Sequence, residues 1–109
     1  MADLRQLLQR YEKITKKLNE LMIQYDKLSY KKGWVEYKKV KNKIGKVYRY
    51  YYYRWRDNNG RTHNVYIGSW NAAVYIINEL KKARNLRKQI KMLKNELAEI
   101  RKLAKTLFS

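Results

Sequence analysis

The chain has 109 residues with no cysteine, no proline and one histidine, and 27 lysine and arginine residues against 9 acidic ones give it a net charge of +18. This length favours a single domain, and the lack of cysteine together with the single histidine excludes disulfide frameworks, zinc sites and thiol catalysis. The charge indicates a polyanionic partner. No apolar run reaches the length of a membrane span. We therefore expect an intracellular protein, cytoplasmic or nucleoid-associated, with no membrane partner.

The first predicted element is a helix. Apolar residues from Leu4 to Leu28 recur at alternating spacings of three and four, which is the pattern of a coiled-coil seam. We predict a helix over residues 1–32, in which Asp3 complements the helix dipole at the start and Gly33 caps the end. Such a seam requires a partner helix elsewhere in the chain.

A strand is expected next, from Trp34 to Val40, followed by a turn at Asn42–Gly45. Which side of this strand faces the protein interior stays open. Apolar residues occupy both parities, with Trp34 and Val40 on one and Val35 and Tyr37 on the other.

The segment Val47–Gly68 predicts a β-hairpin, because two runs of aromatic and β-branched residues flank the turn cluster Asp57–Gly60. A loop of two or four residues would mix arginine with aliphatic side chains on one face. A three-residue loop, with Gly60 left-handed in a G1 bulge, separates them. Apart from Arg49, the expected inner face is then apolar: Val47, Tyr51, Tyr53, Trp55, His63, Val65 and Ile67. The expected outer face holds Tyr48, Tyr50, Tyr52, Arg54, Arg56, Thr62, Asn64 and Tyr66.

A second helix over residues 69–109 is predicted after Ser69, which serves as its N-cap. Its apolar seam is regular from Ala83 to Leu107 and matches the stretch Leu4–Leu28 in length, so we expect the two seams to pair antiparallel. The preceding residues 70–82 span roughly 18 Å as a helix. That length suffices to cross beneath a three-stranded sheet, where two adjacent alanines would allow close approach.

The predicted fold is α+β with the order αβββα, in which a three-stranded antiparallel sheet (33–68) is inserted at the tip of a long antiparallel two-helix coiled coil, within one domain of residues 1–109. Apolar residues also occur beside the seams, among them Leu8, Met22 and Leu103. Because this extra apolar surface suits pairing of two such hairpins into a four-helix bundle, we expect a homodimer formed through the helices.

Basic and aromatic residues alternate in the sheet region, and residues 31–70 carry 11 basic and 2 acidic side chains. This pattern is typical of nucleic-acid-binding sheets, although tyrosine also has a high strand propensity of its own. On the second helix no acid interrupts the basic residues between Glu79 and Glu96, which favours phosphate contacts over a solvated face of mixed charge. The predicted nucleic-acid-binding residues are Lys38, Lys39, Lys41, Lys43, Lys46, Tyr48, Tyr50, Tyr52, Arg54, Arg56, Arg61, Thr62, Asn64, Tyr66, Lys81, Arg84, Lys88 and Lys91.

Residues that could carry catalysis are scarce. His63 is expected to pack as a neutral imidazole near Trp55, because no second metal ligand accompanies it. Glu36 and Asp57 are the acids of the predicted sheet region, and neither has a carboxylate or nucleophile partner in sequence. We therefore expect no enzyme activity, no metal, no cofactor and no small-molecule substrate.

The stretch R-W-R-D-N-N-G-R-T-H-N-V-Y-I-G leading into S-W-N-A-A, within residues 46–82, resembles the sheet-type DNA-binding domains of plant ethylene-response factors and the arm-binding N-terminal domains of tyrosine integrases. The coiled-coil helices lie outside this resemblance. The composition is similar to that of small basic proteins of thermophilic archaea and their viruses. The resemblance implies a sheet lying in the major groove of duplex DNA, with these residues toward the DNA: Tyr50, Tyr52, Arg54, Arg56, Thr62 and Asn64.

These features together predict a non-enzymatic protein that binds double-stranded DNA, either a small regulator of transcription or a chromatin-like factor. Two alternatives stay open. The protein could bind RNA through stacked tyrosines, or it could use the coiled coil as an adaptor or inhibitor that docks on an acidic protein partner.

Overall fold

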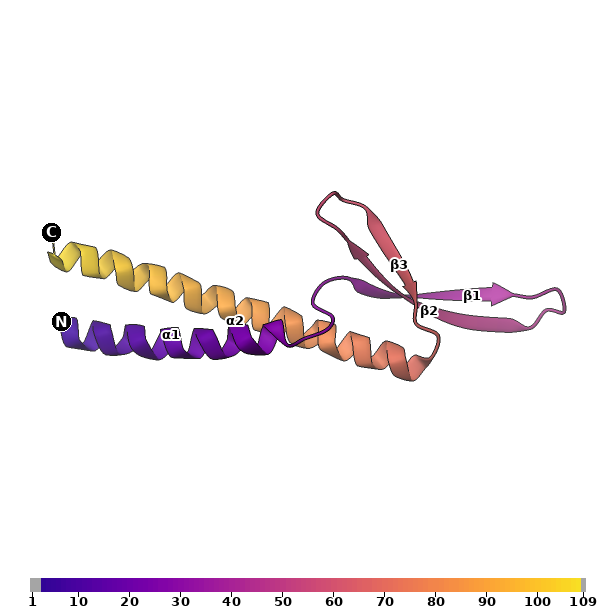
Figure 1. The fold of residues 1–109 in the computed structure, drawn as a ribbon, viewed down its shortest axis with the longest axis horizontal. Coiled ribbons are helices and arrows are strands. Elements are labelled where there is room, and N and C mark those ends of the chain that lie inside the picture. Colours follow the sequence, from indigo (N-terminus) through magenta and orange to yellow (C-terminus); the bar gives the residue numbers. More distant parts are fainter. Residues whose placement is uncertain (1–2, 109) are drawn as a thin grey trace. The chain divides into compact units, whose positions relative to one another are not determined.

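The computed structural model describes residues 3–108, so positions 1, 2 and 109 of the predicted domain lie outside the described residues. Figure 1 shows the order of the elements, which confirms the predicted α+β arrangement αβββα. The chain divides into a helical unit, made of Met1–Lys27 and Asn85–Ser109, and a sheet unit, made of Leu28–Arg84. The elements are α1 (Leu4–Asp26), β1 (Trp34–Lys41), β2 (Val47–Arg56), β3 (Thr62–Tyr66) and α2 (Trp70–Phe108).

The helical unit contains the predicted seam. In Figure 1, α1 and the later part of α2 run side by side in opposite directions, so that the start of α1 and the end of α2 lie at the same end. Ile14 and Leu18 of α1 are buried in one cluster with Leu97 and Ile100 of α2. Because these residues occupy seam positions on both helices, apolar burial joins the two helices as expected.

The end of α1 differs from the predicted helix over residues 1–32, because α1 stops at Asp26 with Lys27 as its C-cap. Leu28, the last residue of the predicted seam, therefore follows the helix. Gly33 is not a helix cap: its φ is +115°, and a Cβ there would lie 2.3 Å from the carbonyl oxygen of Arg54. This glycine allows the chain to pass close to β2, in a conformation that L-residues rarely adopt.

The sheet has the strand order β1-β2-β3, and both pairs are antiparallel. At the β2–β3 turn, the N–H of Gly60 donates to the carbonyl of Asp57 at 3.1 Å and Gly60 has a φ of +80°. Trp55 pairs with His63, as the three-residue loop requires. The predicted turn and its register are therefore confirmed. The β1–β2 turn has the same form, with Gly45 at φ +83°.

The first turns of α2 lie against the odd-numbered side of the sheet. The N–H of Ala72 donates to the hydroxyl of Ser69 at 3.2 Å, which confirms Ser69 as the N-cap. The Trp70 ring lies 5.5 Å from the Tyr51 ring, measured between centroids, and Ala73 is fully buried. This ring contact joins the start of α2 to the odd-numbered side of β2, and the predicted crossing beneath the sheet by residues 70–82 stays a prediction.

Tyr53 connects the sheet to the loop after α1. Its hydroxyl donates to the carbonyl of Lys32, and its ring meets the edge of the Tyr30 ring with centroids 5.0 Å apart. Burial, followed by the proximity of Tyr30, raises the pKa of the Tyr53 hydroxyl above its ordinary value. The inner-face tyrosine therefore serves packing within the sheet unit.

Candidate nucleic-acid interface

The register sorts the side chains of the sheet onto two faces. Each residue pairs with one of the same parity in both ladders, so odd-numbered and even-numbered side chains point to opposite sides. The strand residues of both faces are exposed or half-buried, and Val47 and Val65 of the predicted apolar inner face are 50% and 48% exposed, so that face is not buried as expected. We call this even-numbered surface the tyrosine–arginine face: Trp34, Glu36, Lys38, Val40, Tyr48, Tyr50, Tyr52, Arg54, Arg56, Thr62, Asn64 and Tyr66.

The facing of β1, which the sequence left open, follows from this register. Trp34 and Val40 join the tyrosine–arginine face, whereas Val35 and Tyr37 lie on the odd face. Both faces carry apolar side chains here because the outer part of the β1–β2 hairpin is exposed, with Tyr37 42% and Val40 46% accessible. Because neither face of this part of β1 is buried, its sequence lacks the alternation of apolar and polar residues that would show which side faces the interior.

Four tyrosine rings form a connected row on the tyrosine–arginine face. The Tyr48 and Tyr50 rings are stacked with centroids 6.3 Å apart, and Tyr66 lies 5.9 Å from Tyr50 and 5.7 Å from Tyr52. These contacts join neighbours along β2 and across to β3. They hold the rings side by side as a broad aromatic surface with hydroxyl groups at its edge.

Lysine ammonium groups lie over two rings of this row. Lys38 Nζ is 5.4 Å from the centroid of the Tyr52 ring, and Lys46 Nζ is 5.6 Å from that of Tyr48. Both distances are within the range of a cation–π interaction. The cations are thereby held close to the aromatic surface, where a phosphate could be bound by an ammonium group and a tyrosine hydroxyl together.

Arg54 is placed on the predicted face but is less free than the sequence suggested. Its Nη1 lies 3.0 Å from a carboxylate oxygen of Glu36, and its Nε donates to the side-chain oxygen of Asn64 at 3.4 Å. The acid on β1 and the amide on β3 therefore orient the guanidinium from both sides. Sequence reasoning missed this pair, because the facing of β1 was unresolved. Arg56, at the end of β2, is exposed.

Two predicted contact residues of β1 lie on the other side of the sheet. Lys39 and Lys41 have odd numbers and pair with Arg49 and Val47, so they do not belong to the tyrosine–arginine face. Both are exposed. Arg49, the one exception on the predicted apolar face, lies over the Tyr37 ring at 6.0 Å, so cations surround this end of the hairpin on both sides.

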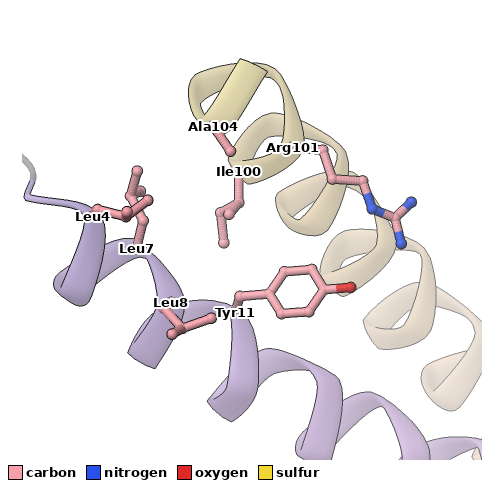
Figure 2. A pocket seen from close by; sticks show the side chains of 7 residues that line it. All are labelled: Leu4, Leu7, Leu8, Tyr11, Ile100, Arg101 and Ala104. Carbon is pink, nitrogen blue, oxygen red and sulfur yellow. The ribbon is translucent and has the colours of Figure 1, made fainter. Parts of the chain in front are cut away.

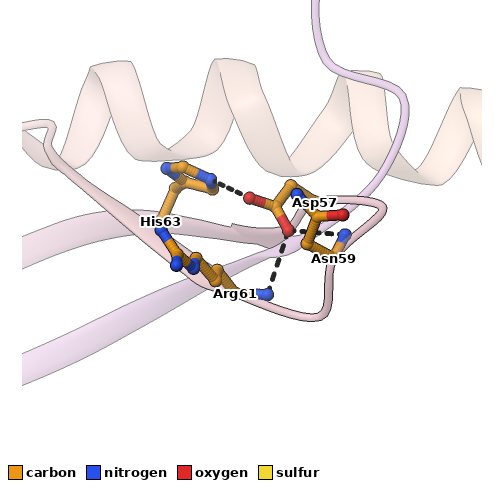
Figure 3. A network of polar contacts seen from close by, with 4 residues as sticks. All are labelled: Asp57, Asn59, Arg61 and His63. Atoms are coloured by element: carbon orange, nitrogen blue, oxygen red, sulfur yellow. Dashed lines mark hydrogen bonds and ion pairs between the residues drawn. The ribbon is translucent and has the colours of Figure 1, made fainter.

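Figure 3 shows the polar network of the β2–β3 turn. One carboxylate oxygen of Asp57 accepts the N–H groups of Asn59 and Arg61 at 2.9 and 3.0 Å, and the other pairs with Nε2 of His63 at 2.8 Å. His63 stacks on Trp55 with centroids 5.0 Å apart, as predicted. Its pairing with Asp57 was not foreseen. The bond from His63, followed by that from Arg61, lowers the pKa of Asp57.

The predicted basic stripe of α2 is exposed throughout. Lys81 and Arg84 belong to the sheet unit, and Lys88 and Lys91 belong to the helical unit. Their spacing of three and four along one helix gives them a common helical face. Each unit therefore carries cations outside its apolar core.

The helical unit has an open apolar end (Figure 2). A groove of about 470 Å³ lies between the start of α1 and the end of α2, and its lining is apolar apart from Arg101. Leu8 at its edge is 57% exposed, and Leu107, the last seam residue, is 54% exposed. The predicted homodimer through the helices stays a prediction. The groove is lined by Leu4, Leu7, Leu8, Tyr11, Ile100, Arg101 and Ala104.

Within residues 3–108, neither α1 nor α2 combines the length and apolar character that crossing a membrane requires. Comparison of the chain with protein-family models, with characterised proteins and with solved structures finds no match. The resemblance to sheet-type DNA-binding domains therefore stays a prediction.

Proposed function

We propose that this protein is a non-enzymatic, double-stranded-DNA-binding protein, a small regulator or a chromatin-like factor, that contacts DNA through the tyrosine–arginine face. The observation that carries the proposal is the composition of this exposed face. A row of four tyrosine rings is accompanied by Lys38 and Lys46 above it and by Arg54 and Arg56 at its end. Sheets that bind nucleic acid combine cations for phosphates with polar and aromatic groups for sugars and base edges.

The electrostatic field supports the same partner. The net charge of +18 is divided between both units, since the sheet unit holds 14 basic and 3 acidic residues and the remainder holds 13 and 6. A field of one sign steers association with a polyanion and releases its counterions on binding. A partner with only a few acidic groups would leave most of this charge unneutralised.

The oriented Arg54 suggests how a base edge is contacted. A guanidinium fixed by Glu36 and Asn64 presents its remaining N–H donors in a set direction, which suits two-point recognition of a base edge in the major groove. That groove is about 12 Å wide in B-DNA and admits β-structure. The major groove of A-form RNA is too deep and narrow for side chains to read, so duplex DNA is favoured over duplex RNA.

A pair of matched double variants tests the use of the tyrosine–arginine face. Lys38→Gln with Lys46→Gln removes the two cations above the tyrosine row, and Lys13→Gln with Lys16→Gln removes two exposed cations from α1. Both variants lose the same charge. We expect the first to reduce the slope of log binding constant against log salt concentration by about 2 and to weaken duplex binding, and the second to change the slope by less than about 1.

Fluorescence anisotropy of a labelled duplex at several salt concentrations measures these slopes, and circular dichroism checks that all variants keep their helix content. Equal effects of the two double variants would contradict the proposed face. Competition with unlabelled single-stranded RNA and duplex RNA separates the substrates. RNA that displaces the duplex at lower concentration than unlabelled duplex DNA would assign the face to RNA instead.

A further inference from the structure

The β1–β2 hairpin extends beyond the part of the sheet that has three strands. β3 ends at Tyr66, opposite Tyr52, and the last bond on that edge runs from the N–H of Ile67 to the carbonyl of Tyr51. Residues 38–50 therefore form a two-stranded ribbon, which we call the arm. It holds six basic residues and no acidic one, and it is roughly 15 to 20 Å long at about 3.3 Å per residue.

The tip of the arm is an ordered turn. The side-chain oxygen of Asn42 accepts the N–H of Ile44 at 3.0 Å and that of Lys46 at 2.9 Å, and the Asn42 carbonyl accepts the N–H of Gly45 at 3.0 Å. These bonds leave the turn little conformational freedom. Ile44 stands at its apex and is 92% exposed, with Lys43 beside it in the chain.

The β2–β3 turn provides an internal comparison. In the β2–β3 turn, Asp57 accepts the N–H groups of Asn59, Gly60 and Arg61. In the β1–β2 turn, Asn42 accepts the N–H groups at the equivalent positions, which are Ile44, Gly45 and Lys46. Asn59 thus occupies in one turn the position that Ile44 occupies in the other. The turn geometry does not require an apolar residue there, and β-branched side chains are unusual in turns, where asparagine, aspartate, glycine and serine dominate.

An isolated apolar side chain on a surface needs no special explanation, but Ile44 combines three features. It is almost fully exposed, it occupies a turn position that favours polar residues, and it sits at the end of a ribbon whose charged residues are all basic. Burial in a partner would remove this apolar side chain from water, which is favourable. The lysines around it restrict that partner to one with anionic groups beside an apolar slot.

We infer that Ile44 is a wedge that enters a base step of duplex DNA, while the lysines of the arm contact the flanking phosphates. The inference rests on the proposed function, because it takes duplex DNA as the partner. Proteins that insert isoleucine, leucine or methionine between base pairs unstack the step and bend the duplex by about 20–90°. A stacked base step flanked by phosphates has the combination of apolar slot and anionic rim that the arm fits.

The rigid turn matters for this role. Unstacking a base step costs free energy, and a wedge on a mobile loop would add the entropic cost of ordering the loop. The hydrogen bonds of Asn42 remove that additional term. The proposed wedge therefore predicts bending as well as binding, and it predicts tighter binding to a duplex that is already unstacked at one position.

The variant Ile44→Asn tests the wedge with little risk to the fold, since it copies the residue of the β2–β3 turn. Ile44→Leu keeps an apolar wedge, and Asn59→Ala changes the equivalent position of the other turn. Bending is measured by fluorescence resonance energy transfer between dyes at the two ends of a 30-base-pair duplex. Affinity is measured by anisotropy on that duplex and on the same duplex with one mismatched base pair.

We expect the wild type, Ile44→Leu and Asn59→Ala to bend the duplex and to favour the mismatch by at least about tenfold. Ile44→Asn should abolish the bend and most of the mismatch preference while keeping salt-dependent duplex binding. Salt-dependent binding with no bend, or a bend that Ile44→Asn retains, would overturn the wedge and leave the proposed function standing. Failure of the wild type to bind duplex DNA would overturn both.

Discussion

The carboxylate of Glu79 on α2 accepts the backbone N–H of Tyr30 at 2.9 Å, and the same oxygen accepts the N–H of Ser29 at 3.0 Å. Its second oxygen accepts the hydroxyl of Tyr75 at 2.9 Å, which raises the pKa of that hydroxyl above its ordinary value. An acid on the helix thus holds the loop that leaves α1. Glu79, the acid that precedes the basic run of α2, therefore has a structural role.

Replacing Glu79 with alanine is expected to lower the free energy of unfolding by about 2 kcal/mol, because two backbone N–H groups and one hydroxyl lose a charged acceptor. Urea denaturation measures the change. The control is Glu99→Ala, which removes an exposed acid from the same helix and should change stability by less than about 0.5 kcal/mol. Similar losses for both variants would show that Glu79 acts only through its charge.

Gly33→Ala is expected to destabilise the protein far more than Gly45→Ala. Both glycines have positive φ, but a Cβ at Gly33 would lie 2.3 Å from the carbonyl oxygen of Arg54, whereas at Gly45 nothing lies within 4 Å. We expect a loss of roughly 1–2 kcal/mol at Gly45 from the left-handed backbone alone and at least about 3 kcal/mol at Gly33. Thermal denaturation of the two variants in parallel measures this difference, and equal melting temperatures would contradict the close approach.

The Asp57 turn predicts a pH dependence of stability. Hydrogen bonds from His63 and from the N–H of Arg61 lower the pKa of Asp57 in the folded protein. The carboxylate therefore contributes its full stabilisation above its unfolded pKa of about 3.9, and it loses that stabilisation as the pH falls through the lower folded-state pKa. Asp57→Asn keeps an acceptor for the turn, as Asn42 does in the first hairpin, and removes the titration.

Urea denaturation of the wild type and of Asp57→Asn from pH 2 to pH 7 measures this contribution. The difference between the two free energies of unfolding should shrink as the pH falls below about 4. A difference that stays unchanged down to pH 2 would mean that the Asp57 carboxylate is not bonded as the structure has it.

Much of the fold could be predicted because it depends on local periodicity. The seam spacing on both helices and the parity set by the Gly60 turn follow from residues close together in the chain. The contacts that were missed join residues far apart or depend on an unresolved facing. Glu79 reaches a loop 49 residues earlier, and the Glu36–Arg54 pair requires the facing of β1, which an exposed ribbon does not reveal. Neither contact produces a repeating residue pattern by which it could be predicted from the sequence.

The predicted homodimer can be tested at the open end of the helical unit. Leu8→Gln with Leu103→Gln places amides at two positions that are 57% and 48% exposed, so the fold of the unit should change little. If the helices pair between two copies, sedimentation velocity should find a dimer for the wild type and a shift toward monomer for the variant. Ile23→Gln, another exposed apolar position on α1, serves as the control, and a monomeric wild type would contradict the prediction.

The central measurement is the salt dependence of wild-type binding to duplex DNA. Anisotropy titrations of a labelled 30-base-pair duplex between 50 and 300 mM salt give the slope of log binding constant against log salt concentration. If the tyrosine–arginine face and the surrounding lysines neutralise about six to eight phosphates, the slope should be about −5 to −7. A slope near zero, or no binding at the lowest salt concentration, would contradict DNA binding by this protein.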